Sequence, residues 1–150
     1  MIRMSKETDY AIVLLAYFAE DHKGLKRSAR QVAMESRLPL PMVRKILKVL
    51  AREELLVSHR GAKGGYSLVR RGERISIGEI IKAMEGPLAM TECIEAPGEC
   101  RHEPVCGLRT NWQTINEIVF KALDSLTLSD LTGSFSHPLP SGPSELVSLH

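Results

Sequence analysis

The chain has 150 residues, of which 43% are apolar and 25% are charged, enough for one globular domain with its own core. Its net charge of +2 conceals a strong split, because residues 1–75 carry 16 basic and 8 acidic side chains and residues 76–150 carry 4 and 10. Halves with net charges of +8 and −6 indicate different partners. We find no catalytic nucleophile paired with a general base, no phosphate-binding loop and no cofactor fingerprint. Their absence from the sequence argues against an enzyme and against a small-molecule substrate.

The apolar run at residues 11–19 is too short to cross a bilayer, and no signal-peptide cleavage pattern follows it. We therefore expect a cytoplasmic protein without a membrane partner, in a compartment where cysteines stay reduced.

Three helices are expected in the first half. Ser5 can cap a first helix that ends near Gly24, and Ser28 with Gln31 forms a capping box that opens a second. Pro41 suits the first turn of a third helix, which runs roughly to Glu54. Apolar residues repeat along this third helix with spacings of three and four, at Val43, Ile46, Leu47 and Leu50.

Two β-prone runs follow and flank Gly61, Gly64 and Gly65, which predicts a hairpin with Arg60 and Lys63 at its tip. A hairpin after a helix-turn-helix is a wing. The expected fold is therefore mainly α with a small β-hairpin wing: a winged helix-turn-helix over residues 1–75, joined to a long C-terminal dimerisation helix.

The basic residues of the third helix lie almost opposite its apolar residues, so one face suits the core and the other an anion. Arg44 and Lys45 are expected to reach base edges, and Lys48 to meet phosphate. The complete set of expected DNA-binding residues is Ser28, Pro41, Met42, Arg44, Lys45, Lys48, Arg60 and Lys63. A protein-binding adaptor is the competing use of a winged helix.

The three cysteines, Cys93, Cys100 and Cys106, lie within fourteen residues of each other in a segment with two prolines and one glycine. Such a segment is expected to be irregular. Spacing alone leaves three readings open: unlinked thiols, a zinc site that uses His102, or an iron–sulfur cluster with an open coordination position. Four acidic residues interleave the cysteines, so a bound cation would offset a crowded negative field.

Ser76 and Glu79 form another capping box, which opens a short helix that ends at Gly86. Beyond the cysteines, apolar residues at heptad-like spacing predict a helix with one apolar seam, formed by Leu108, Trp112, Ile115, Val119, Ala122 and Leu126. This seam favours dimerisation, with packing on the chain's own core as the alternative. Residues 76–132 are thus read as a cluster-binding loop and dimerisation helix, and residues 133–150 as a disordered tail rich in proline and serine.

Four segments and the three cysteines carry a resemblance to a known family. The segments are RMSKETDYAIVLL, VSHRGAKGGYSL, ISIGEIIKAMEG and LTLSDL. They resemble the winged-helix iron–sulfur regulators, the family that includes IscR and NsrR, and look most like the branch that regulates the SUF iron–sulfur assembly operon. The resemblance spans roughly residues 1–132 and implies a homodimer that binds a palindromic operator in double-stranded DNA. It also implies one cluster per subunit, [2Fe–2S] or [4Fe–4S], held by Cys93, Cys100 and Cys106.

One position departs from the family pattern. Members similar to IscR supply a histidine three residues after the last cysteine, where this chain has Arg109. In the nitric-oxide sensor an acid on the first helix of the opposite subunit is a ligand, and Asp9 matches that position. Asp9 can equally be read as a first-turn acid favoured by the helix dipole. His102 and Glu103 also stay open as ligands.

The sequence therefore predicts a DNA-binding transcriptional regulator, a repressor of iron–sulfur assembly genes whose DNA affinity depends on cluster occupancy. The alternatives are a nitric-oxide or redox sensor that represses stress genes, and a regulator that depends on zinc or on thiols alone.

Overall fold

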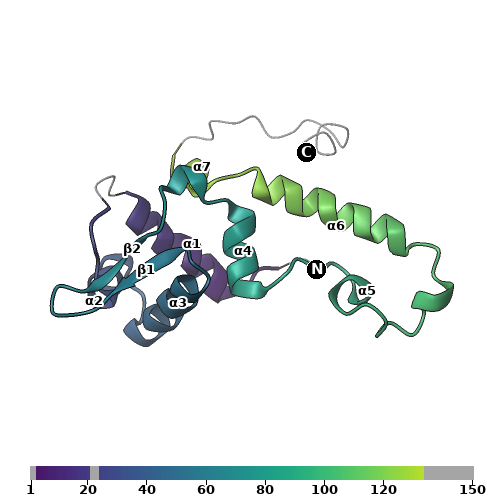
Figure 1. Ribbon diagram of the computed structural model, residues 1–150, viewed down its shortest axis with the longest axis horizontal. Coiled ribbons are helices and arrows are strands. Elements are labelled where there is room, and N and C mark those ends of the chain that lie inside the picture. The colour runs from purple at the N-terminus through teal and green to yellow at the C-terminus, as the bar shows by residue number, and fades with distance from the viewer. Residues whose placement is uncertain (1–2, 21–23, 134–150) are drawn as a thin grey trace.

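The computed structural model describes residues 3–20 and 24–133 (Figure 1). Seven α-helices, two 3-10 turns and one hairpin are found in this part of the chain. In chain order the elements are α1 (Lys6–Ala19), α2 (Ala29–Ser36), α3 (Leu40–Arg52), β1 (Leu56–His59), β2 (Gly65–Leu68), η1 (Gly72–Arg74), α4 (Ile77–Glu85), α5 (Glu92–Glu95), η2 (Glu103–Val105), α6 (Arg109–Asp124) and α7 (Leu128–Thr132). The expected fold class, mainly helical with a hairpin wing, is confirmed.

The helices begin where their capping residues predict. Ser5 accepts the Thr8 backbone N–H at 3.2 Å, and the capping boxes of Ser28 and Ser76 both form. The first helix is shorter than expected, because it ends at Ala19 rather than near Gly24. The third ends at Arg52, two residues before its expected end.

One hydrophobic core joins the helices to the hairpin. The apolar residues of α3, namely Val43, Ile46, Leu47 and Leu50, are all completely buried in it. Burial of each side chain of this size stabilises the folded state by about 1.5–3 kcal/mol. The core continues past residue 75, because Ile77, Ile80 and Ile81 of α4 and Leu128 of α7 belong to it as well. Two helices of the second half thus pack as part of the winged helix.

The hairpin is a two-stranded antiparallel sheet in which Leu56 pairs with Leu68 and His59 with Gly65. Arg27, just before α2, adds an isolated bridge to Tyr66, with backbone hydrogen bonds of 2.9 and 2.8 Å. The wing is therefore joined by backbone to the start of the second helix.

A second bridge joins the start of α4 to the end of α6. The Ile77 backbone N–H donates to Leu126 and the Leu128 N–H to Ile75, both at 2.8 Å. Gly78 permits this approach, because a Cβ there would lie 3.0 Å from an oxygen of Asp124. The long helix is thus anchored to the winged helix at its carboxyl end.

The first turn of α1 is held by the last residue of α4. The Glu85 carboxylate accepts from the Thr8 hydroxyl at 2.5 Å and from the Ser5 backbone N–H at 2.8 Å. These hydrogen bonds hold the pKa of Glu85 below its usual value. Glu85 is also the last residue of α4, so the chain that leads toward Cys93 leaves α4 from a point fixed against α1.

The cysteine segment is less irregular than expected. Cys93 lies in α5, and η2 directly precedes Cys106. The proline and glycine residues restrict these helical elements to single turns rather than preventing them.

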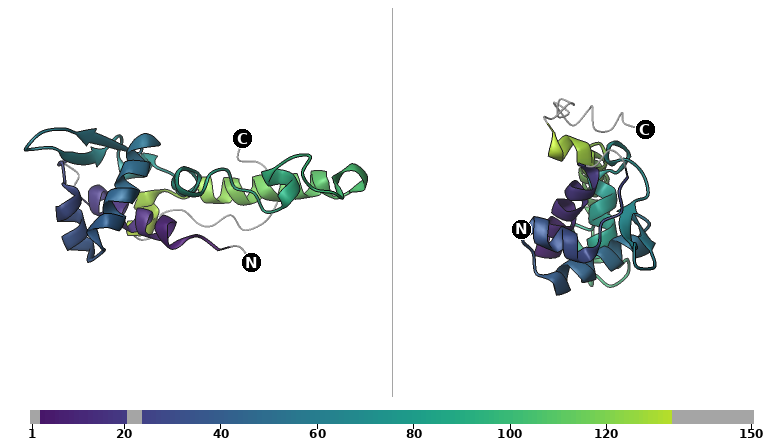
Figure 2. Two further views of the ribbon diagram at one scale, coloured as in Figure 1. Left: turned by 90° about the horizontal axis from the view of Figure 1, so that it is seen from below. Right: turned by 90° about the vertical axis from the view of Figure 1, so that its left-hand side faces the viewer.

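Figure 2 shows an elongated molecule, with the winged helix at one end and the outer part of α6 and the cysteine segment at the other. No residue of α6 is buried, and the first three members of the predicted seam, Leu108, Trp112 and Ile115, are exposed. The expected disordered tail lies outside the described residues, apart from Gly133. Within the described part of the chain, no helix is long and apolar enough to span a membrane.

Candidate nucleic-acid interface and cysteine segment

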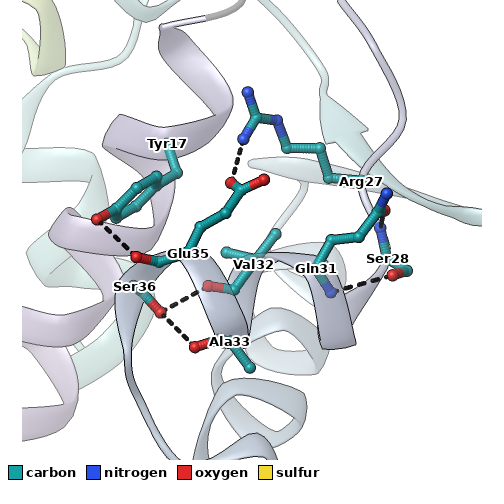
Figure 3. A network of polar contacts seen from close by, with 8 residues as sticks. All are labelled: Tyr17, Arg27, Ser28, Gln31, Val32, Ala33, Glu35 and Ser36. Carbon is teal, nitrogen blue, oxygen red and sulfur yellow. Dashed lines mark hydrogen bonds and ion pairs between the residues drawn. The ribbon is translucent and has the colours of Figure 1, made fainter.

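Helix α2 is fixed by polar contacts at both ends (Figure 3). At its start the Ser28 hydroxyl accepts the Gln31 backbone N–H at 3.2 Å, and the Gln31 side chain accepts the Ser28 N–H at 2.8 Å. Near its end Glu35 pairs with Arg27, and the Tyr17 hydroxyl donates to the Glu35 carbonyl at 3.2 Å. Ser28 therefore acts first as a helix cap, and the other first-turn N–H groups of α2, which have no partner within the helix, are the ones available to an anion.

Helix α3 presents the basic face that the sequence predicts. Arg44 and Lys48 are exposed, and Pro41 is exposed in the first turn. Met42 is half-buried and packs against the core, so it offers less surface to DNA than expected.

Lys45 of α3 is already engaged in an ion pair. Its ammonium group lies 2.7 Å from the Glu7 carboxylate in the first turn of α1. Both side chains are largely in solvent, with exposed fractions of 64% and 42%. A pair of this kind contributes about 0–1 kcal/mol to stability. It can therefore open when a phosphate approaches.

The wing carries Arg60 and Lys63 in the loop between β1 and β2, and both are exposed. The loop turns through Gly61, which has φ +102°, and the Gly64 N–H donates to its carbonyl at 2.9 Å. Gly65 then lies so close to α2 that a Cβ would be 2.6 Å from the Arg27 carbonyl oxygen. The wing tip is therefore held in place relative to α2.

The three cysteines are free thiols, with Cys93 buried and Cys100 and Cys106 half-buried. Within the residues that the structure describes, no three His, Cys, Asp or Glu side chains converge in a way that could hold a metal ion. The donor set suits an iron–sulfur cluster, because three unlinked thiols lie on one short segment. Binding would require the thiols to move together and a further ligand to be supplied.

Arg109 is tied to the cysteine segment through Glu103. Its Nε lies 2.9 Å from one Glu103 carboxylate oxygen, and the other oxygen accepts the Gly98 N–H at 2.7 Å. Both oxygens of Glu103 are thus occupied. Asp9 and His102 stay exposed, so they are the more accessible of the candidate fourth ligands.

Sequence reasoning missed the roles of five residues that shape these regions. Glu7 and Asn116 make contacts that no local pattern signals, and the pair of Glu103 and Arg109 depends on how the cysteine segment turns. Arg30 could have been predicted from the sequence as a residue that contacts an anion, because a basic residue in the first turn after a capping serine lies beside the free N–H groups of that turn. It is exposed.

Comparison with known proteins gives consistent matches along the chain. The Rrf2 family, described as iron-dependent transcriptional regulators, matches residues 4–134. The transcriptional repressor NsrR of Streptomyces coelicolor is 30% identical over 95% of this chain and 93% of its own. The structure of CymR, the global cysteine regulator of Bacillus subtilis, is similar with a TM-score of 0.67 and 28% identity, over 88% of this chain and 97% of that one. IscR of T. potens is similar with a TM-score of 0.63 and 25% identity, over 87% and 85%.

Proposed function

Because the chain belongs to the Rrf2 family of transcriptional regulators, we propose that it is a homodimeric repressor whose affinity for DNA depends on an iron–sulfur cluster. Its targets are genes of iron–sulfur cluster assembly, such as the SUF operon. The observation that carries this proposal is the position of three free thiols on the segment between the winged helix and the long exposed helix.

The DNA-reading residues lie on α3 and the wing. Arg44 reads base edges in the major groove, with Pro41 and part of Met42 in apolar contact. Lys48 meets phosphate, and Arg60 and Lys63 reach the backbone or the minor groove beside it. Lys45 joins them once it leaves Glu7. The outward N–H groups of α2, near Ser28, hold a further phosphate. In a homodimer two such surfaces face the halves of a palindromic operator.

Cys93, Cys100 and Cys106 would hold the cluster, with Asp9 of the partner subunit as a fourth ligand. Thiolate ligation leaves the remaining position for a weaker, exchangeable ligand, which makes the cluster responsive to its supply and to oxidants. Ligation across the dimer would tie the cysteine segment of one subunit to the first turn of α1 in the other. That turn also carries Glu7, the partner of Lys45 on the DNA-reading helix. Cluster occupancy in one subunit would thereby affect how α3, the DNA-reading helix of the other subunit, binds DNA.

The test is purification without oxygen, followed by absorption and Mössbauer spectra and by fluorescence anisotropy with operator DNA at one salt concentration. We expect a brown protein whose spectrum is lost in Cys93→Ala, and different operator affinities for the forms with and without the cluster. Equal affinities would contradict the proposed switch. A colourless protein that retains zinc, or no metal, would identify a zinc- or thiol-dependent regulator. A reaction with nitric oxide that releases DNA at stress genes would identify a nitric-oxide sensor instead.

A further inference from the structure

Asn116 makes two hydrogen bonds from the middle of α6 to the chain that leads into the cysteine segment. Its side-chain N–H donates to the Leu88 carbonyl at 2.8 Å, and its side-chain oxygen accepts the Met90 backbone N–H at 3.1 Å. The amide thus pairs with a carbonyl and an N–H two residues apart, as a neighbouring β-strand would. Two such bonds fix both the position and the register of residues 88–90 on the helix.

Asparagine is an unfavourable residue type for this position in the middle of a helix. Asparagine is a poor helix former, and its side chain commonly competes with the backbone for hydrogen bonds. In the middle of α6 it therefore weakens the helix unless its amide has another role. A neutral amide can donate and accept at once, whereas aspartate can only accept and an apolar residue can do neither.

The held segment leads directly to the buried thiol. Cys93 lies three residues beyond Met90, and its sulfur is 3.3 Å from the Thr91 hydroxyl. Asn116, Leu88 and Met90 are all half-buried, so their hydrogen bonds are partly shielded from water. Loss of the amide would leave the Met90 N–H and the Leu88 carbonyl without these partners, at a greater cost than in open solvent.

We propose that Asn116 is a positioning residue, which fixes the start of the cysteine segment on α6 and so holds Cys93 in place for a metal centre. The metal centre itself rests on the proposed function. The two hydrogen bonds from Asn116 to residues 88–90, which we call the clamp, do not. Since α6 is also the proposed dimer helix, Asn116 would connect the thiols to the element that both subunits share.

The test compares Asn116→Asp with the wild-type full-length chain. Aspartate has nearly the same shape, but it lacks the donor and places a negative charge against the Leu88 carbonyl. Asn111→Asp is the matched control, because it makes the same change at an exposed site of the same helix. Asn116→Ala is a second variant that removes the clamp without adding charge.

The first measurement is amide hydrogen exchange in the metal-free proteins. We expect exchange at Met90 to quicken about tenfold in Asn116→Ala, which removes the acceptor of its N–H, and to stay unchanged in Asn111→Asp. Asn116→Asp keeps that acceptor but repels the Leu88 carbonyl, so exchange at Met90 should quicken less in this variant. The core of the winged helix, such as the α3 amides, should be unaffected. Unchanged exchange at Met90 in Asn116→Ala would overturn the clamp, whether or not the protein binds a cluster.

The second measurement is the absorption and circular dichroism spectrum of the cluster, with its lifetime in air. We expect an altered spectrum and a lifetime shortened several-fold in the Asn116 variants, with the same melting temperature for the metal-free proteins. Faster exchange with an unchanged spectrum and lifetime would overturn the positioning role. A wild-type protein without a cluster would overturn both that role and the proposed function, and the exchange result would then stand alone.

Discussion

At the scale of single residues, the contact between Glu7 and Lys45 places a carboxylate at the proposed DNA-reading surface. The two groups lie 2.7 Å apart and are both exposed, so their pairing adds little to folding stability. Its effect should instead fall on DNA binding, because Glu7 neutralises a basic residue of α3 and repels phosphate.

We therefore expect Glu7→Gln to strengthen binding to operator DNA by about 3- to 10-fold at low salt. The dependence on salt should steepen by about one phosphate contact, since Lys45 becomes free to neutralise phosphate. Fluorescence anisotropy over a series of salt concentrations measures both quantities.

Two controls isolate the contact. Glu20→Gln removes the same charge from the other end of α1 and should have little effect. In a Lys45→Met background, the gain from Glu7→Gln should largely disappear. An equal gain with and without Lys45 would mean that Glu7 acts only through its own charge.

Residue roles could be predicted where the determining contact is local. Ser28 and Gln31 are three residues apart, and the structure confirms their capping box. Glu7 and Lys45 are 38 residues apart, and Asn116 is 28 residues from Leu88. Such contacts depend on how helices pack, which no local pattern contains. The ligand roles of the cysteines and Asp9 stay predictions.

At the scale of elements, the close approach of β2 to the start of α2 fixes the wing. Gly65 has φ +143°, a conformation that side chains rarely adopt, and a Cβ would meet the Arg27 carbonyl oxygen at 2.6 Å. Both obstacles involve backbone, so neither can be relieved by rotating a side chain.

We expect Gly65→Ala to destabilise the protein by about 2 kcal/mol or more, from backbone strain and overpacking together. In a chain of this size that lowers the melting temperature by about 4 °C or more. DNA affinity should also fall, because the wing must shift away from α2. Thermal unfolding and anisotropy measure these effects.

Gly107→Ala is the control for this change. A Cβ at Gly107 meets nothing within 4 Å, so the melting temperature should hardly change. A Gly65→Ala protein as stable as wild type would indicate that the wing is free to move relative to α2.

Elements could be predicted where a pattern is long enough to repeat. The apolar spacing over α3 predicts its buried face, and all four predicted core residues are completely buried. The helices α5 and η2 contain four and three residues. A single helical turn is too short to show a repeating apolar pattern, and the proline and glycine residues beside it predict irregular chain. The structure corrects that prediction, because both turns are helical.

At the scale of the whole molecule, the winged helix and the cysteine segment occupy opposite ends, and α6 extends between them (Figure 2). The sequence places a boundary at residue 75, where the charge changes sign. The core crosses that point because α4 has its own apolar face, formed by Ile77, Ile80 and Ile81. Surface charge carries information about partners, and apolar side chains determine packing.

The outer part of α6 presents a row of apolar side chains that the described part of the chain leaves partly exposed. Leu108, Trp112 and Ile115 are 57%, 36% and 41% exposed. A row of this kind, at the spacing of a two-helix contact, suits a second copy of the same helix. In a symmetric dimer each seam residue lies close to the twofold-related seam.

Trp112→Glu should therefore convert the proposed homodimer to a monomer, since it would bury carboxylates in an apolar contact. We expect sedimentation equilibrium to give the mass of one chain, with an unchanged helical circular dichroism spectrum. Binding to a palindromic operator should weaken by about 100-fold or more, because the two half-sites would no longer be bound by linked subunits.

Thr110→Glu places the same charge two residues earlier, about 200° around the helix, on an exposed position outside the seam. It should stay dimeric, because its carboxylate remains in water. A Trp112→Glu protein that sediments as a dimer would place the subunit contact elsewhere than on α6. It would also weaken the case for Asp9 as a ligand, because ligation across the dimer requires α1 of one subunit to approach the cysteine segment of the other.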